Sequence, residues 1–111
     1  MIKYIMVTTL LTNTNKFDSV ADYRSFVAGI GLFVKQYQTT ELCLANGTIL
    51  SQEEILLSPT TVQSTLVYPS HEDLEASEQV RREAVSKTDS DLALAALGWT
   101  GTSERKTIWS P

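Results

Sequence analysis

The sequence predicts one α+β domain over residues 1–111, with a split β-α-β-β-α-β order that places helices on one face of an antiparallel sheet. Three observations lead to this prediction. A β-branched run opens the chain, a long amphipathic stretch follows it, and a later strand runs directly into a capped helix. A chain of 111 residues has room for one hydrophobic core and is too short for two independent ones.

The first expected element is a buried central strand. Residues 2–11 are rich in β-branched side chains and are followed by the polar turn at 12–16. A run that is apolar on both sides is typical of a strand in the middle of a sheet. Its side chains should alternate, with Tyr4, Met6 and Thr8 on one face and Ile5, Val7 and Thr9 on the other.

Apolar residues then recur every three or four positions, which predicts a helix over residues 19–37. Asp18 or Ser19 is a natural N-cap, and Ser19 with Asp22 fits a capping box. Gly29 and Gly31 lie inside this stretch, where glycine disfavours a helix. They indicate either a close approach to a neighbouring backbone or a local break.

The next segment, residues 40–51, contains Asn46-Gly47 between apolar arms and predicts a β-hairpin with a type I′ turn, with Cys43 in one arm. A short apolar piece at 53–57 follows it. Residues 61–68 then alternate as a strand, which ends at Pro69.

Ser70 should cap a polar helix over 70–86 with a thin apolar stripe. That stripe consists of Leu74, Ala76, Val80 and Ala84. We expect a short helix at 92–97 and a last edge strand at 107–109. The helices then cover one face of the sheet, and the other face needs a ligand, a long loop or a second copy of the chain.

The segment 64–76, followed by Arg81-Arg82-Glu83, resembles a feature of the dimeric α+β-barrel superfamily, which has a ferredoxin-like fold and includes the antibiotic-biosynthesis-monooxygenase-like domains. In that superfamily a strand ending in an aromatic residue runs into a Ser-capped acidic helix. The resemblance implies a homodimer whose two sheets pack face to face. It leaves the function open, because members range from oxygenases and haem-degrading enzymes to proteins with no known activity.

Composition argues against several classes of partner. The net charge is −4 and the nine Lys and Arg residues are scattered, so we do not expect nucleic-acid binding. No stretch approaches the length of a membrane span, and the first residues lack the features of a signal peptide. The single cysteine, Cys43, cannot form an internal disulfide. We therefore expect a cytoplasmic protein.

The residues that could carry chemistry are few. His71 is the only histidine, which excludes a His-based triad or a multi-His metal site. Cys43 has no identifiable base beside it and is expected to be a small buried hydrophobe. The acidic groups at 53–54 and 72–75 lack calcium-loop spacing and are expected to be solvated. We therefore expect no metal and no cofactor.

Two hypotheses about function remain open. The first is a homodimeric binding or accessory module that takes a small apolar ligand or a protein partner. The second is a cofactor-independent, monooxygenase-like enzyme acting on a small apolar or aromatic substrate, in a pocket with apolar walls and one or two polar groups. The candidate ligand-binding residues are Tyr4, Tyr68, His71 and Trp109. Trp99 and Trp109 lie in a polar tail and must pack within the protein, across a dimer seam or against a ligand.

Overall fold

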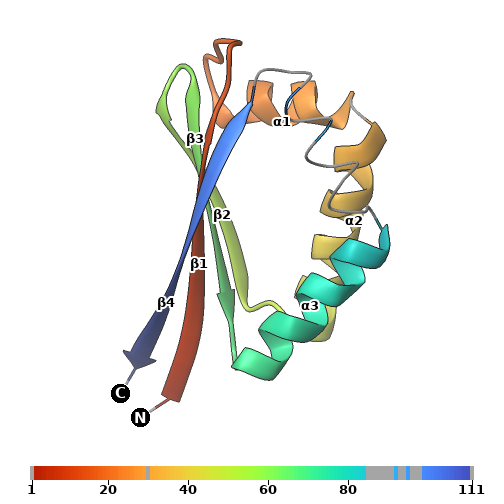
Figure 1. The fold of residues 1–111 in the computed structure, drawn as a ribbon, viewed down its shortest axis with the longest axis vertical. Helices are drawn as coiled ribbons and strands as arrows, with labels where there is room; N and C mark the ends of the chain where they lie inside the picture. The colour runs from red at the N-terminus through yellow and green to blue at the C-terminus, as the bar shows by residue number, and fades with distance from the viewer. Residues whose placement is uncertain (1, 30, 85–91, 93–94, 96–98, 111) are drawn as a thin grey trace.

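A four-stranded antiparallel sheet carries helices against one face (Figure 1). The computed structural model describes residues 2–29, 31–84, 92, 95 and 99–110. The strand order across the sheet is β2-β3-β1-β4, which is the ferredoxin-like order. The predicted α+β architecture is therefore confirmed. Along the chain the elements are β1 (Ile2–Thr12), α1 (Val20–Ala28), α2 (Gly31–Asn46), β2 (Ser51–Ser58), β3 (Thr61–Tyr68), α3 (His71–Ala84) and β4 (Thr100–Ser110).

The predicted alternation of β1 is confirmed by its pairing with β3. Ile5 pairs with Tyr68 on the helix-covered side, and Met6 pairs with Val67 on the opposite side, which we call the open face. On its other edge β1 pairs with β4 from Thr12–Thr100 to Ile2–Ser110. The last strand is thus longer than the predicted 107–109, and the two ends of the chain lie side by side (Figure 1).

The predicted single helix over 19–37 is wrong, because α1 ends at Ala28 and α2 begins at Gly31. The local break at the glycines is the alternative that holds. The predicted cap is confirmed, since the Asp22 amide donates to Ser19 Oγ at 3.1 Å. At the other end of α1 the Gly29 amide donates to the Phe26 carbonyl at 3.1 Å.

The predicted hairpin at 40–51 is also wrong, because α2 continues through Asn46 and contains Cys43. Gly47 has φ 82°, and beyond it the Ile49 amide donates to the Cys43 carbonyl at 3.1 Å. Such a bond satisfies a carbonyl that has no partner inside the helix. An Asn-Gly pair supplies the left-handed residue for a hairpin and for a helix C-terminus alike, so the local signal does not separate the two.

The cap of α3 is confirmed, because Ser70 Oγ accepts from the Asp73 amide at 3.1 Å. The predicted apolar stripe of this helix is only partly right. Leu74 is fully buried, but Val80 is 45% exposed and the second buried position is Ser77. The predicted helix at 92–97 lies largely outside the described residues.

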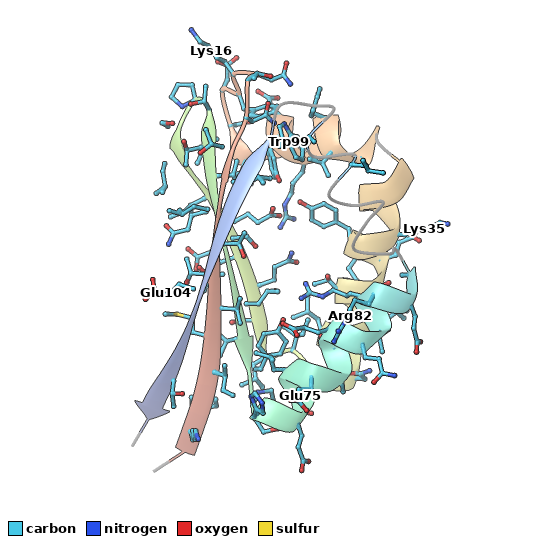
Figure 2. All side chains as sticks on the ribbon, viewed as in Figure 1. Lys16, Lys35, Glu75, Arg82, Trp99 and Glu104 are labelled. Carbon is cyan, nitrogen blue, oxygen red and sulfur yellow. The ribbon has the colours of Figure 1, made fainter. Side chains whose placement is uncertain are left out.

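Two separate apolar clusters join the helices to the sheet. The α3 cluster comprises Ile5, Cys43, Ile49, Leu66, Tyr68 and Leu74. The α1 cluster comprises Phe17, Tyr23, Val27, Val62 and Trp99. Trp99 lies near α1 in Figure 2 and its ring contacts those of Tyr23 and Phe26, so it packs within the protein.

We expect Gly47→Ala to lower the free energy of unfolding by about 1 kcal/mol, because a Cβ atom disfavours the left-handed backbone. No atom lies within 4 Å of the added Cβ, so strain rather than a clash causes the loss. Urea denaturation measures it. Gly47→Asn is the matched control and should cost less, because asparagine tolerates this conformation. Equal free energies of unfolding for Gly47→Ala and the natural protein would contradict the left-handed conformation of Gly47.

Candidate functional site

A polar row crosses the helix-covered face of the sheet between the two apolar clusters. Thr9 on β1 pairs with Ser64 on β3, and Ser64 pairs with Glu54 on β2. β1 and β3 are the central strands, yet Thr9 and Ser64 are only partly buried. The row lies between the two apolar clusters, and we call the region above it the central cleft.

Glu54 is the anchor of the first polar group in the central cleft. Its side chain is 4% exposed, and it accepts from Arg24 on α1 and from Tyr37 on α2. Arg24 Nε and Nη2 each lie 2.8 Å from Glu54 Oε1, and the Tyr37 hydroxyl lies 2.8 Å from Oε2. A buried carboxylate needs such charge-assisted bonds to remain ionised. The group therefore ties both helices to the sheet.

The tyrosines beside Glu54 are held in their neutral form. Burial, with a smaller contribution from Glu54, raises the pKa of Tyr23 to about 12. Burial also raises the pKa of Tyr37, and Tyr23 and Glu54 add to that effect. Both phenols therefore remain protonated near neutral pH, and that of Tyr37 donates to Glu54.

A second polar group lies at the end of β3, inside the α3 cluster. Tyr68 is fully buried, and Arg81 Nη2 in the last turn of α3 lies 3.3 Å from its hydroxyl. Burial raises the pKa of Tyr68, and Arg81 opposes that shift. Ser77 is also fully buried, and its Oγ forms no hydrogen bond of ordinary geometry. Within the described ranges no carboxylate lies within 4 Å of the Arg81 guanidinium.

The four predicted ligand-binding residues are not brought together by the structure. Tyr68 lies beneath the helices, whereas Tyr4 alternates with Ile5 and therefore lies on the open face. His71 is exposed, with its Nε2 3.0 Å from Glu75 Oε1. Trp109 pairs with Lys3 in the β1–β4 ladder.

Five residues of the two polar groups were missed or misread from the sequence, and Arg24 and Tyr37 of the first group were not named as site residues at all. Arg81 and Ser77 carried no site signal, and Glu54 was expected to be solvated with Glu53. Glu53 is indeed exposed, but Glu54 points to the helix side, where Gln52 and Leu56 also lie. The alternation of β2 was the available signal, because it places one of two adjacent glutamates on each face.

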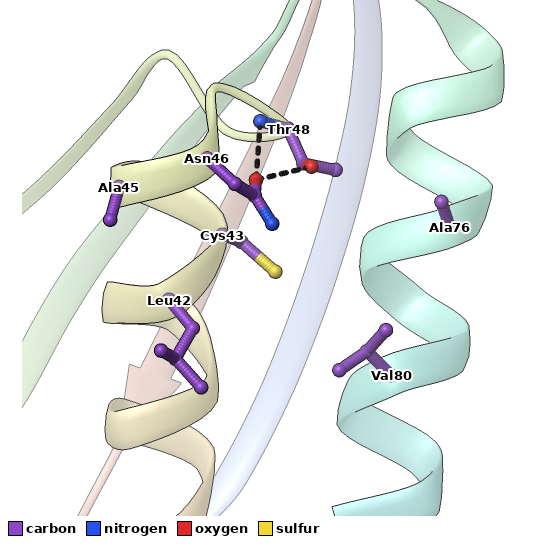
Figure 3. A pocket seen from close by; sticks show the side chains of 7 residues that line it. All are labelled: Leu42, Cys43, Ala45, Asn46, Thr48, Ala76 and Val80. Carbon is purple, nitrogen blue, oxygen red and sulfur yellow. Dashed lines mark hydrogen bonds between the residues drawn. The ribbon is translucent and has the colours of Figure 1, made fainter.

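A groove of about 520 Å³ separates α2 from α3 (Figure 3). Leu42 and Val80 form its walls, and Cys43 Sγ points into it from α2. At one end the Thr48 amide donates to Asn46 Oδ1 at 2.9 Å. Cys43 is 3% exposed, in agreement with its expected role as a small buried hydrophobe.

Two further kinds of site were searched for in the described part of the chain. No group of three or more His, Cys, Asp or Glu side chains there could hold a metal ion. None of its helices combines the length and the apolar character that crossing a bilayer requires.

Comparison with known proteins gives structural matches only. No protein-family model matches the chain, and no curated protein sequence matches it significantly. A dimeric ferredoxin-like protein from an uncultured marine organism superposes with a TM-score of 0.63 at 16% identity, covering 98% of each chain. A protein of unknown function from Nitrosomonas europaea gives a TM-score of 0.56 at 14% identity, covering 99% of this chain and 93% of that one.

A cofactor-independent oxygenase from Streptomyces nogalater, SnoaB, superposes with a TM-score of 0.51 at 11% identity, covering 98% of this chain and 94% of the oxygenase. These likenesses agree with the resemblance of residues 64–83 and show that the chain has the ferredoxin-like fold found in dimeric α+β-barrel proteins. At such low identity they establish the fold and leave the chemistry to the residues of this chain.

We expect the free energy of unfolding to fall between pH 10 and pH 12 partly through Tyr23. The folded pKa of about 12 exceeds the ordinary value of 10.0, so the unfolded chain loses this proton first and stability decreases as pH rises. Tyr23→Phe should make that decline shallower by up to about 1.4 kcal/mol per pH unit. Urea denaturation across this pH range measures the change in the free energy of unfolding. Below pH 9 that free energy should vary with pH in parallel for the natural protein and for Tyr23→Phe. An unchanged slope would contradict the buried, neutral phenol.

Proposed function

We propose that this protein is a cytoplasmic homodimeric binding protein whose protomers each hold a small aromatic molecule in the central cleft. The acidic oxygen of that ligand, a carboxylate or a phenolate, binds Arg81 and Tyr68. The apolar clusters on either side supply the walls for the rings. Thr9, Ser64 and Glu54 supply polar contacts along the floor.

The observation that carries this proposal is the position of Arg81. Its guanidinium reaches from α3 to the hydroxyl of the fully buried Tyr68 on β3, and no carboxylate among the described residues forms an ion pair with it. A partly buried cation is stabilised when an anion joins it. A bound oxyanion would supply that charge and would receive further bonds from Tyr68 and Ser77.

The dimer is supported by the composition of the open face. Its apolar side chains include Leu10, which is 39% exposed, and Ile55, which is 40% exposed. Met6 and Val67 pair on the same face, which also carries the polar residues Thr8, Thr65 and Glu53. The exposed apolar side chains favour an interface on this face. Two structural neighbours are described as dimeric ferredoxin-like proteins.

Sedimentation velocity at micromolar concentration should show a species of twice the 12.3 kDa chain mass. Val67→Arg should convert it to a monomer, because an unpaired charge at the centre of an apolar interface is strongly unfavourable. Ser25→Arg is the matched control, since Ser25 is exposed on α1 in the helix layer and the dimer should persist. A monomeric natural protein, or a dimer unaffected by Val67→Arg, would refute sheet-to-sheet pairing.

Ligand binding can be measured with 1-hydroxy-2-naphthoate, a fluorescent aromatic acid. Arg81→Gln should weaken binding by about tenfold or more, the contribution of a hydrogen bond to a charged group. Arg82→Gln is the matched control, because Arg82 is exposed and its Nε donates to the Glu78 carbonyl on the same helix. The proposal fails if both variants bind like the natural protein while circular dichroism shows each of them folded.

A second candidate function is oxygenation of such an aromatic ligand without a cofactor. It is favoured by the likeness in fold to the oxygenase from Streptomyces nogalater over nearly the whole chain. In this case the protein would orient the substrate and exclude water, and the substrate itself would react with oxygen. Oxygen uptake with 1,8-dihydroxynaphthalene in the presence of a chelator separates the two functions. A rate equal to that without protein rejects the enzyme and leaves the binding protein.

A further inference from the structure

A small pocket of about 240 Å³ lies between α1 and α2. Its lining consists of Arg24, Ala28, Tyr37, Gln38 and Glu41. Arg24 and Tyr37 also hold Glu54, so these two side chains form a wall between the pocket and the central cleft. The volume is below the usual range of about 300–1,000 Å³ for drug-sized ligands, so the pocket suits a smaller molecule than the aromatic ligand proposed for the cleft.

Arg24 is held in place from its inner side. Its Nε and Nη2 both bind Glu54 Oε1 at 2.8 Å, and the guanidinium carbon lies 6.0 Å from the centre of the Tyr37 ring. Glu54 is 4% exposed and Arg24 is 49% exposed, so the carboxylate is interior and the cation extends to the surface. A guanidinium has five N–H donors, and those that face outward remain for another acceptor. Because the position of the Arg24 side chain is already fixed, little further conformational entropy is lost when it binds a ligand.

The opposite charge lies on the other helix. Glu41 follows Tyr37 by one helical turn, lines the same pocket and is exposed. No ion pair joins Arg24 to Glu41 in the part of the chain described, so each can bind a group of opposite charge. Glu54 binds the inner N–H groups of Arg24, and among the described residues no ion pair engages Glu41, which can therefore attract a cation.

We propose that this pocket binds a small zwitterion of the α-amino acid class. The carboxylate of the ligand binds the outer N–H groups of Arg24, and its ammonium group binds Glu41. Ala28 and the ring of Tyr37 contact its apolar part, and the Gln38 amide lies at the rim. Glu54 is a positioning residue, because it fixes Arg24 without touching the ligand. The site shares Glu54 with the central cleft, but its ligand contacts come from the pocket between α1 and α2.

Titration of the isotope-labelled protein with L-leucine, followed by NMR of the Gln38 side-chain amide and the Tyr37 ring, tests this proposal. Leucine should give saturable shifts. 3-Methylbutylamine, which lacks the carboxylate, should bind about tenfold more weakly, because it loses a hydrogen bond to a charged group. 4-Methylpentanoate, which lacks the ammonium group, should bind about threefold more weakly, because an exposed ion pair contributes less. Equal affinities for the three compounds, or no saturable shift with leucine, would overturn the proposal.

Variants then assign the charges. Glu41→Gln alters an exposed side chain, leaves the buried group intact and should bring leucine to the affinity of 4-methylpentanoate. Glu54→Gln should weaken the binding of leucine, because the substitution removes the carboxylate that holds Arg24 in position. The contribution of Glu41 to binding should remain unchanged. Glu72→Gln is the charge-matched control, because it removes the same charge from an exposed residue of α3 that does not line the pocket. A loss with Glu72→Gln as large as that with Glu41→Gln would show general electrostatics and refute the site.

Discussion

Among the described residues, two apolar clusters hold α1, α2 and α3 on the sheet. Each cluster lies at one end of the helix-covered face, and the row between them is polar. Burying apolar area supplies the attraction at both ends, but the centre depends on hydrogen bonds and charge. Glu54 therefore stabilises the packing of both helices on the sheet. Among the described carboxylates it is the only one that α1 and α2 both contact.

The elements that could be predicted are those set by local pattern. The alternation in β1 and β3 and the two serine caps follow from neighbouring residues, and the structure confirms them. The Asn46-Gly47 hairpin failed because a positive φ is required both in that turn and after a helix. The break after α1 could be stated only as an alternative, since a glycine pair permits a break without requiring one.

The two polar groups of the helix-covered face lay beyond such reasoning. Arg24 and Glu54 are 30 positions apart, and Tyr68 and Arg81 are 13 apart on different elements. Their contacts exist only after the helices have packed on the sheet. Ser77 shows the same difficulty, because a serine in a polar helix gives no sign of complete burial. Tyr68 could be named from the sequence because it ends a strand just before the cap of α3, which is a local feature, and its role in ligand binding stays a prediction.

The pairing of Ile2 with Ser110 brings the beginning and the end of the described chain together on adjacent strands. The order of the strands along the chain could therefore be changed while their order across the sheet is kept. A short bridge between these strands would close the backbone into a ring, and a cut in an exposed loop elsewhere would leave each ladder intact. Circular permutants of this kind would retain the same neighbours in space while changing which contacts form between residues close in the chain.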